Sequence, residues 1–265
     1  MQIAENTLFT GKVAIHLEKT DSTNNYAKRL LSKQKPSEGT AIIADFQEQG
    51  KGQPVAPDGM MGNKWESEEG KNLLVTYVFY PKFLEAANQF YLNMAMSLAV
   101  METVHQLCKK EVLVKWPNDI YVEEKKISGI LIENTISGNN FSSSLIGIGL
   151  NVNQIFPEVD VPANRALKNP VSLKMLTDKN FKLQSVFEKL SANIENRYLQ
   201  LMKTNFRLIK KDYLDHLYQY KTFAWYRTKQ DRFEGAISGI DETGRLMIDT
   251  DGETRVVDFK EVGFE

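Results

Sequence analysis

The sequence has little cysteine and no long hydrophobic run. Cys108 is the one cysteine among 265 residues, which excludes an intrachain disulfide and a metal site built from several cysteines. No stretch approaches the roughly 18 apolar residues that a membrane-spanning helix needs, and the N-terminal segment lacks the apolar run of a signal peptide. We therefore expect a reducing, cytoplasmic location and no membrane partner.

The chain also lacks an excess of charge of either sign. It contains 33 Lys and Arg residues and 34 Asp and Glu residues, which gives a formal net charge of -1. Proteins that bind mainly phosphates concentrate basic charge, so we expect no nucleic-acid partner. The three histidines, His16, His105 and His216, show no metal-binding spacing. We predict no metal site formed by side chains of this chain.

The segment KWPND, residues 115–119, is the most informative part of the chain. Pro117 fixes its own φ and favours an extended residue before it, so the segment reads as a strand end that enters a polar turn presenting Asn118 and Asp119. The β-branched segment KISGILIE, residues 126–133, follows and predicts a strand. Strict alternation along it places Lys126 at the rim of an apolar sheet, on the face opposite Gly129 and Leu131.

These two segments resemble the catalytic core of the biotin protein ligases. By itself KWPND could be an ordinary surface turn. Further segments nevertheless match motifs of that family, and they occur in the family's order: DSTN at 21–24, a glycine loop at 50–53, WESEEGKNL at 65–73 and GIGLN at 147–151. The resemblance spans nearly the whole chain.

The resemblance implies a biotin site. DSTN has the composition of a simple helix cap, but hydroxyls at a helix start can also bind a polar ligand head. Gln47 ends a predicted strand, and its amide can both donate to and accept from a ureido group. Gly147 and Gly149 share one strand face and predict a groove free of side chains. The implied biotin-binding residues are Ser22, Thr23, Asn24, Gln47, Gly50, Lys51, Lys126, Gly129, Leu131, Gly147 and Gly149.

The resemblance also implies a nucleotide site, with one departure from the family. The family's loop GRGRxGxxW is rich in arginine, whereas this chain has Lys51 and Gln53 at those positions and a stretch around 54–60 that looks inserted. Lysine supplies charge but not a bidentate fork, so we expect weaker or differently arranged phosphate contacts. Trp65 lies against adenine in the family, although a core aromatic would fit equally well. The implied adenylate-binding residues are Lys51, Gln53, Trp65, Asn118, Lys126 and Asn151.

The implied reaction has two steps. Biotin and ATP, with Mg²⁺, give biotinyl-5'-AMP and pyrophosphate, and the biotinyl group then passes to a lysine of a biotin carboxyl carrier protein. The implied catalytic residues are Lys126, which would bridge carboxylate and α-phosphate, and Asp119, which would place or deprotonate the incoming lysine. Two alternatives stay open: a lipoate or octanoate protein ligase of the same fold, and a biotin-binding module without catalysis.

The expected fold class is α+β, with a mixed or antiparallel sheet covered by helices, as in the class II synthetase-like catalytic domain of biotin ligases. Apolar spacing predicts helices at 25–31, 85–108, 183–201 and 210–218, and one helical turn at 172–176.

Short alternating segments after residue 223 predict a small β-barrel, which resembles the ligases' SH3-like domain. We predict a catalytic domain at 1–218 and an SH3-like domain at 219–265. Because the chain begins at the catalytic domain, we expect a monofunctional ligase without an N-terminal DNA-binding domain. A homodimer is left open.

Overall fold

The computed structural model describes residues 1–50, 52, 65–157, 169–259 and 261–265. Its main element is a seven-stranded sheet in the order β1-β2-β3-β7-β6-β5-β4. β1 and β2 pair in parallel and the other neighbours are antiparallel, so the predicted mixed sheet is confirmed. The strands are β1 (Ala14–Thr20), β2 (Thr40–Gln47), β3 (Leu73–Phe79), β4 (Leu113–Lys115), β5 (Asp119–Val122), β6 (Lys125–Ser137) and β7 (Asn140–Leu150).

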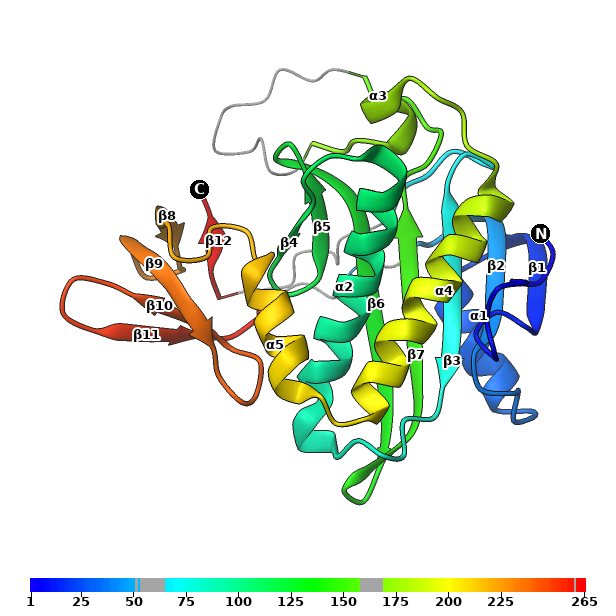
Figure 1. Ribbon diagram of the computed structural model, residues 1–265, viewed down its shortest axis with the longest axis horizontal. Coiled ribbons are helices and arrows are strands. Elements are labelled where there is room, and N and C mark those ends of the chain that lie inside the picture. The colour runs from blue at the N-terminus through cyan, green and yellow to red at the C-terminus, as the bar shows by residue number, and fades with distance from the viewer. Residues whose placement is uncertain (51, 53–64, 158–168, 260) are drawn as a thin grey trace.

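Helices cover the two faces of this sheet unequally (Figure 1). The long helices α2 (Gln89–Cys108) and α4 (Leu183–Met202) cover one face, with α5 (Phe206–Asp215) against α2. Tyr77 of β3 is fully buried beneath them and stacks on Phe187 of α4 with ring centroids 6.3 Å apart. The other face carries α1 (Thr23–Leu31), whose Ala27 packs on Ile42 and Val78. We call this face, on which α1 is the contacting helix among the described residues, the open face of the sheet.

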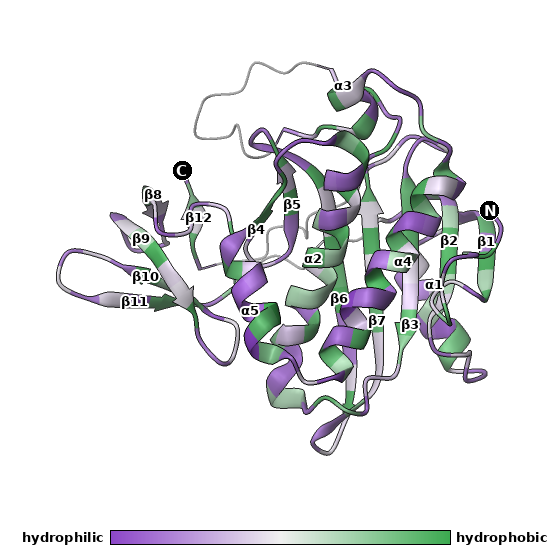
Figure 2. Cartoon of the chain, in the orientation of Figure 1, coloured by the Kyte–Doolittle hydropathy of each residue, from purple (hydrophilic) through white to green (hydrophobic). Residues whose placement is uncertain are grey.

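Two of the covering helices, α4 and α5, are amphipathic, whereas α2 is buried over most of its surface. α4 and α5 carry both apolar and polar segments in Figure 2, because one side of each packs on the core and the other meets solvent. Two shorter elements, η1 (Ala86–Asn88) and α3 (Leu173–Thr177), flank the bundle. Among the described residues, no helix combines the length and the apolar character needed to cross a membrane.

The last predicted helix was placed wrongly. It spans Phe206–Asp215, not 210–218. Phe206 starts it early by stacking on Tyr91 of α2, with ring centroids 4.5 Å apart. Residues 216–218 instead run beside β4, because Val114 donates its N–H to the His216 carbonyl and accepts one from Tyr218. The predicted helix 25–31 lies within α1, which begins at Thr23.

A second, five-stranded sheet follows α5 and lies beside it (Figure 1). Its neighbours are all antiparallel, in the order β11-β10-β9-β8-β12. The strands are β8 (Phe223–Arg227), β9 (Arg232–Ile240), β10 (Leu246–Asp249), β11 (Thr254–Val257) and β12 (Gly263–Phe264). This sheet attaches directly to the KWPND segment, since Trp116 donates its indole N–H to the Gly244 carbonyl at 2.9 Å and stacks on Phe259.

The KWPND turn is also held from the helical side. Tyr213 of α5 is fully buried and donates its hydroxyl to the Pro117 carbonyl at 2.7 Å. Burial, and secondarily the charge of Asp119, raises the pKa of Tyr213 well above its usual value. The hydroxyl therefore stays protonated and can donate throughout the physiological pH range.

Tyr213→Phe removes this donor and leaves the Pro117 carbonyl without it. We expect the free energy of unfolding to fall by about 1–3 kcal/mol, measured by urea denaturation. Tyr226→Phe is the matched control, because Tyr226 is equally buried and its hydroxyl has no partner among the described atoms. That control should leave stability unchanged or higher. Equal losses in the two variants would show that the Pro117 contact adds nothing.

Candidate active site

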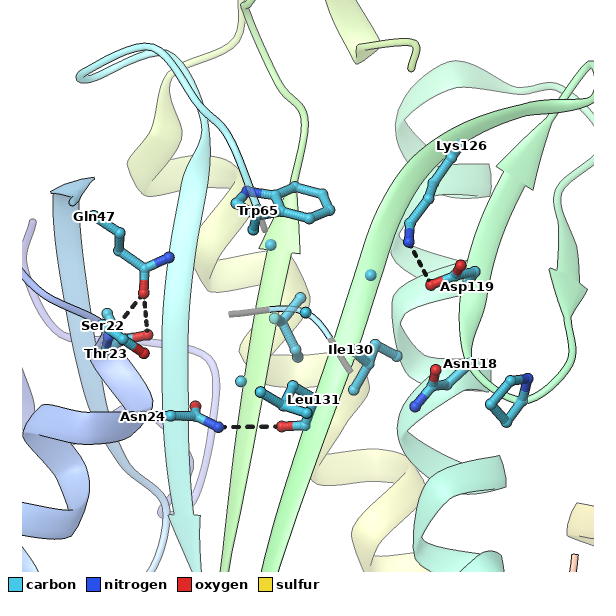
Figure 3. A pocket seen from close by; sticks show the side chains of 16 residues that line it. Ser22, Thr23, Asn24, Gln47, Trp65, Asn118, Asp119, Lys126, Ile130 and Leu131 are labelled. Carbon is cyan, nitrogen blue, oxygen red and sulfur yellow. Dashed lines mark hydrogen bonds and ion pairs between the residues drawn. The ribbon is translucent and has the colours of Figure 1, made fainter. Parts of the chain in front are cut away.

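One pocket on the open face of the sheet gathers most of the predicted site residues (Figure 3). It encloses about 100 Å³. Its lining comprises Ser22, Thr23, Asn24, Gln47, Gly52, Trp65, Pro117, Asn118, Asp119, Lys126, Gly129, Ile130, Leu131, Gly147, Ile148 and Gly149. Segments that are more than a hundred residues apart in the chain thus meet because their strands lie in one sheet.

Among the described residues, Gly50 and Asn151 are the predicted site residues that do not line the pocket. Lys51 and Gln53 lie outside the described residues. Gly50 packs against the backbone of Trp65 instead of lining the pocket. Its carbonyl accepts the Trp65 N–H at 2.9 Å, and a Cβ on Gly50 would lie 2.3 Å from the Trp65 carbonyl oxygen. Asn151 is buried and donates its side-chain amide to the Val171 carbonyl, away from the pocket.

Asp119 and Lys126 form an ion pair at one end of the pocket, which we call the charged end. The distance from Lys126 Nζ to Asp119 Oδ1 is 2.7 Å. Each side chain is about a third exposed, so solvent screens the pair and its contribution to stability is small, about 1 kcal/mol or less. Asn118 lies beside the pair and is 3% exposed. A partly accessible cation next to a carboxylate is suited to meeting an incoming anion.

Lys126 reaches this end because strict alternation fails at one residue. Tyr121 of β5 pairs with Lys126 and Ile120 pairs with Ser128, so Ile127 is left without an opposite residue and the register shifts. A bulge of this kind turns one side chain to the other face. Lys126 therefore lies over Gly129, within about 3.3 Å of where a Cβ would be. The prediction that Lys126 faces away from Gly129 and Leu131 is wrong for this reason.

The polar end of the pocket consists of Ser22, Thr23 and Gln47. Thr23 donates both its backbone N–H and its hydroxyl to Gln47 Oε1, at 2.7 and 3.0 Å. Ser22 occupies the N-cap position of α1, but its side chain makes no capping hydrogen bond. The DSTN segment is therefore not a side-chain cap, and its hydroxyls are turned toward the pocket.

The two strand glycines make room for protein side chains. A Cβ on Gly147 would lie 2.3 Å from Asn24 Oδ1, and a Cβ on Gly149 would lie 2.4 Å from the Trp65 indole. The predicted groove free of side chains is therefore wrong as stated, because Asn24 and Trp65 occupy the space over the glycines. The pocket lies between these side chains and the two ends.

Sequence reasoning missed several residues of the site. Ile130, Ile148 and Pro117 line the pocket within motifs already singled out. Thr76 was missed altogether, although its hydroxyl lies under the polar end and contacts both Thr23 and Asn24. A hydroxyl in the middle of the apolar strand LLVTYVF was the available signal. Within the described part of the chain, no group of three or more His, Cys, Asp or Glu side chains could hold a metal ion.

Comparison with known proteins places this geometry in a family. A profile of the biotin/lipoate A/B protein ligase family matches residues 17–151, which include both ends of the pocket. The chain belongs to this family. The bifunctional ligase/repressor BirA of Bacillus subtilis is 30% identical over 242 residues, which are 91% of this chain and 70% of that protein.

Two other family members match over nearly their whole length. The biotin–[acetyl-CoA-carboxylase] ligase of Paracoccus denitrificans is 27% identical over 252 residues, 94% of this chain and 99% of that protein. The biotin protein ligase of Aquifex aeolicus, solved in complex with biotin and ATP, superposes with a TM-score of 0.74 and 26% identity, covering 96% of this chain and 99% of that one. The family's fold therefore extends through the second sheet.

Gly149→Ala should displace the Trp65 indole, because the added Cβ would overlap it. In a Trp225→Phe background the two remaining tryptophans are Trp116, which is buried, and Trp65, which is partly exposed. Quenching of tryptophan fluorescence by acrylamide therefore reports mainly on Trp65. We expect a larger quenchable fraction in Gly149→Ala. Gly239→Ala, where a Cβ meets nothing within 4 Å, is the control. Identical quenching in the two variants would contradict the indole's placement over Gly149.

Proposed function

We propose that the protein activates biotin with ATP to biotinyl-5'-AMP and transfers the biotinyl group to a specific lysine of a biotin carboxyl carrier protein. The observation that carries this proposal is a single pocket with hydrogen-bonding groups at the polar end and the Lys126–Asp119 pair at the charged end. Biotin has the same two-ended character, a ureido ring and a carboxylate. The Aquifex relative was solved with biotin and ATP, which supports this assignment.

In the first step a biotin carboxylate oxygen attacks the α-phosphorus of ATP, and the bond from that phosphorus to pyrophosphate breaks. Two anions approach each other, so the step needs a fixed cation where negative charge accumulates. Lys126 is that cation, because its ammonium group stands at the charged end with a flexible stem over Gly129. Biotin's own carboxylate is the nucleophile, so no nucleophilic side chain is required.

Mg²⁺ enters with ATP as part of the substrate. Mg²⁺ commonly keeps its waters and binds through one or two carboxylates plus the phosphates. Asp119 lines the pocket and would supply one such carboxylate to Mg²⁺ held by ATP. Asn118 would orient the nucleotide and Trp65 would cover the adenine, while phosphate contacts from Lys51 and Gln53 stay predictions.

In the second step the ε-amine of the acceptor lysine attacks the acyl carbon, and AMP leaves with the bonding electron pair. The amine must lose a proton as the amide forms. Asp119 is placed to orient that amine and accept its proton, because its carboxylate stands next to Lys126, where the mixed anhydride would lie.

The second sheet and the cellular setting complete the proposal. We infer that residues 219–265 form an SH3-like domain, supported by five short antiparallel strands. The cytoplasm is the expected location, since the single cysteine, Cys108, forms no intrachain disulfide and fits a reducing compartment.

The direct test is incubation with biotin, ATP and Mg²⁺, followed by mass spectrometry for biotinyl-5'-AMP. A parallel reaction with lipoate in place of biotin separates the two substrate classes covered by the family name. Adenylate formed from biotin alone supports the proposal. Adenylate formed from lipoate alone, or biotin binding without pyrophosphate release, would overturn it.

Lys126→Ala should retain biotin binding but slow biotin-dependent ATP–pyrophosphate exchange by roughly 10²–10³-fold, about 2.7–4 kcal/mol, as for the loss of one preorganised charge partner. Lys125→Ala is the matched control, because Lys125 is the neighbouring lysine, is exposed and does not line the pocket. It should exchange at the wild-type rate. An unchanged rate in folded Lys126→Ala would refute the role assigned to this lysine.

A further inference from the structure

Asn24 stands in the pocket wall, and hydrogen bonds hold its side chain on both sides. Its Oδ1 accepts the Thr76 hydroxyl at 2.6 Å. Its Nδ2 donates to Glu133 Oε2 at 2.9 Å and faces the Leu131 carbonyl at 3.4 Å. The residue is 3% exposed and lies over Gly147. Asn24 is thus fixed by three neighbouring strands.

These bonds leave Asn24 with little to offer a ligand. A side-chain amide has one oxygen acceptor and two N–H donors. Thr76 donates to the oxygen and leaves it one lone pair, while Glu133 and the Leu131 carbonyl accept from the two N–H groups. Asn24 therefore offers a ligand no N–H donor and at most one acceptor lone pair.

The same count of donors and acceptors shows which group of the Gln47 amide faces the pocket. Its Oε1 already accepts two hydrogen bonds from Thr23, so its amide nitrogen is the group left for the pocket, as Figure 3 shows. The Thr76 hydroxyl lies 2.8 Å from Thr23 Oγ1 and 2.6 Å from Asn24 Oδ1, so its single proton is shared between these two acceptors. One fully buried hydroxyl, that of Thr76, therefore contacts both Thr23 and Asn24.

The hydrogen bonds that run from Thr76 through Asn24 to Glu133 end at the surface in an ion pair. Glu133 Oε1 accepts from Lys28 Nζ of α1 at 2.6 Å while its other oxygen holds Asn24. Glu133 keeps about a quarter of its side chain exposed, and Lys28 about half. This pair anchors α1 to β6 and so fixes where the helix start, with Ser22 and Thr23, stands relative to the sheet.

We propose that Thr76 and Glu133 are positioning residues for the polar end of the pocket. Through Asn24 and Thr23 they orient Gln47 so that its amide N–H groups, together with the Ser22 hydroxyl, meet the carbonyl of a cyclic urea. This inference rests on the proposed function for the identity of the ligand. The arrangement itself, a hydroxyl on β3 that sets the orientation of two amides, can be tested without a ligand.

The ligand-free test uses the side-chain amide signals of Asn24 and Gln47 in ¹⁵N-correlated NMR spectra, assigned with Asn24→Ser and Gln47→Glu. Thr76→Val keeps the shape of the side chain but removes the hydroxyl. We expect it to shift both amide signals and speed their hydrogen exchange. Thr76→Ser, which keeps the hydroxyl, should restore them. Ser144→Ala is the control, because Ser144 is equally buried in the same sheet and its hydroxyl has no partner among the described atoms.

The second measurement is steady-state adenylate formation with the same variants. Thr76→Val should raise the KM for biotin about tenfold, which corresponds to about 1.4 kcal/mol, and leave the KM for ATP and kcat near the wild-type values. Glu133→Met, which removes the acceptor for Asn24, should act in the same direction. A merely structural loss would lower the amount of active enzyme and hence the apparent kcat, without selectively raising the KM for biotin.

The outcomes separate the two claims. A Thr76→Val variant that resembles Ser144→Ala in both measurements overturns the inference, and so do shifted amide signals with an unchanged KM for biotin. If the wild-type protein forms no adenylate and binds no biotin, the proposed function fails, while the spectra still show whether Thr76 holds Asn24 and Gln47. Shifted signals, a raised KM for biotin alone and rescue by Thr76→Ser support the inference.

Discussion

The charged end of the site depends on the register shift between β5 and β6, which brings Lys126 against Asp119. The two side chains meet because the unopposed Ile127 turns Lys126 onto the open face of the sheet, where Asp119 and Gly129 are directly paired. Without that register shift the ammonium group would lie on the face covered by α2 and α4. A single extra residue in one strand therefore decides on which side of the sheet the charge stands.

The turn that presents Asp119 is held by parts of the chain that come much later. Tyr213 of α5 donates to the Pro117 carbonyl, and Gly244 of the second sheet accepts the indole N–H of Trp116. Both donor side chains, Tyr213 and Trp116, are buried, where a lost hydrogen bond costs more than it would at the surface. The second sheet is thus part of the support of the site and not only an appended unit.

The polar end is organised by a different physical rule, the need to satisfy buried polar groups. Thr23, Thr76 and Asn24 lie almost entirely out of solvent, so each must find partners within the protein. Their mutual bonds leave the Gln47 amide nitrogen facing the pocket. Gly147 belongs to the same arrangement, because any larger residue would collide with the Asn24 amide.

The sequence by itself determined the long helices, because apolar periodicity is a property of residues close together in the chain. Its resemblance to the biotin protein ligases implied the mixed sheet and the motifs that make up the pocket. It also predicted that Lys126, Asp119, Thr23 and Gln47 belong to one site. Only the tertiary structure decided that Lys126 shares a face with Gly129, that Asn24 and Trp65 fill the space over Gly147 and Gly149, and that α5 begins at Phe206. Each of these depends on which residue of another strand or helix lies opposite, and that pairing is set by long-range packing rather than by local sequence.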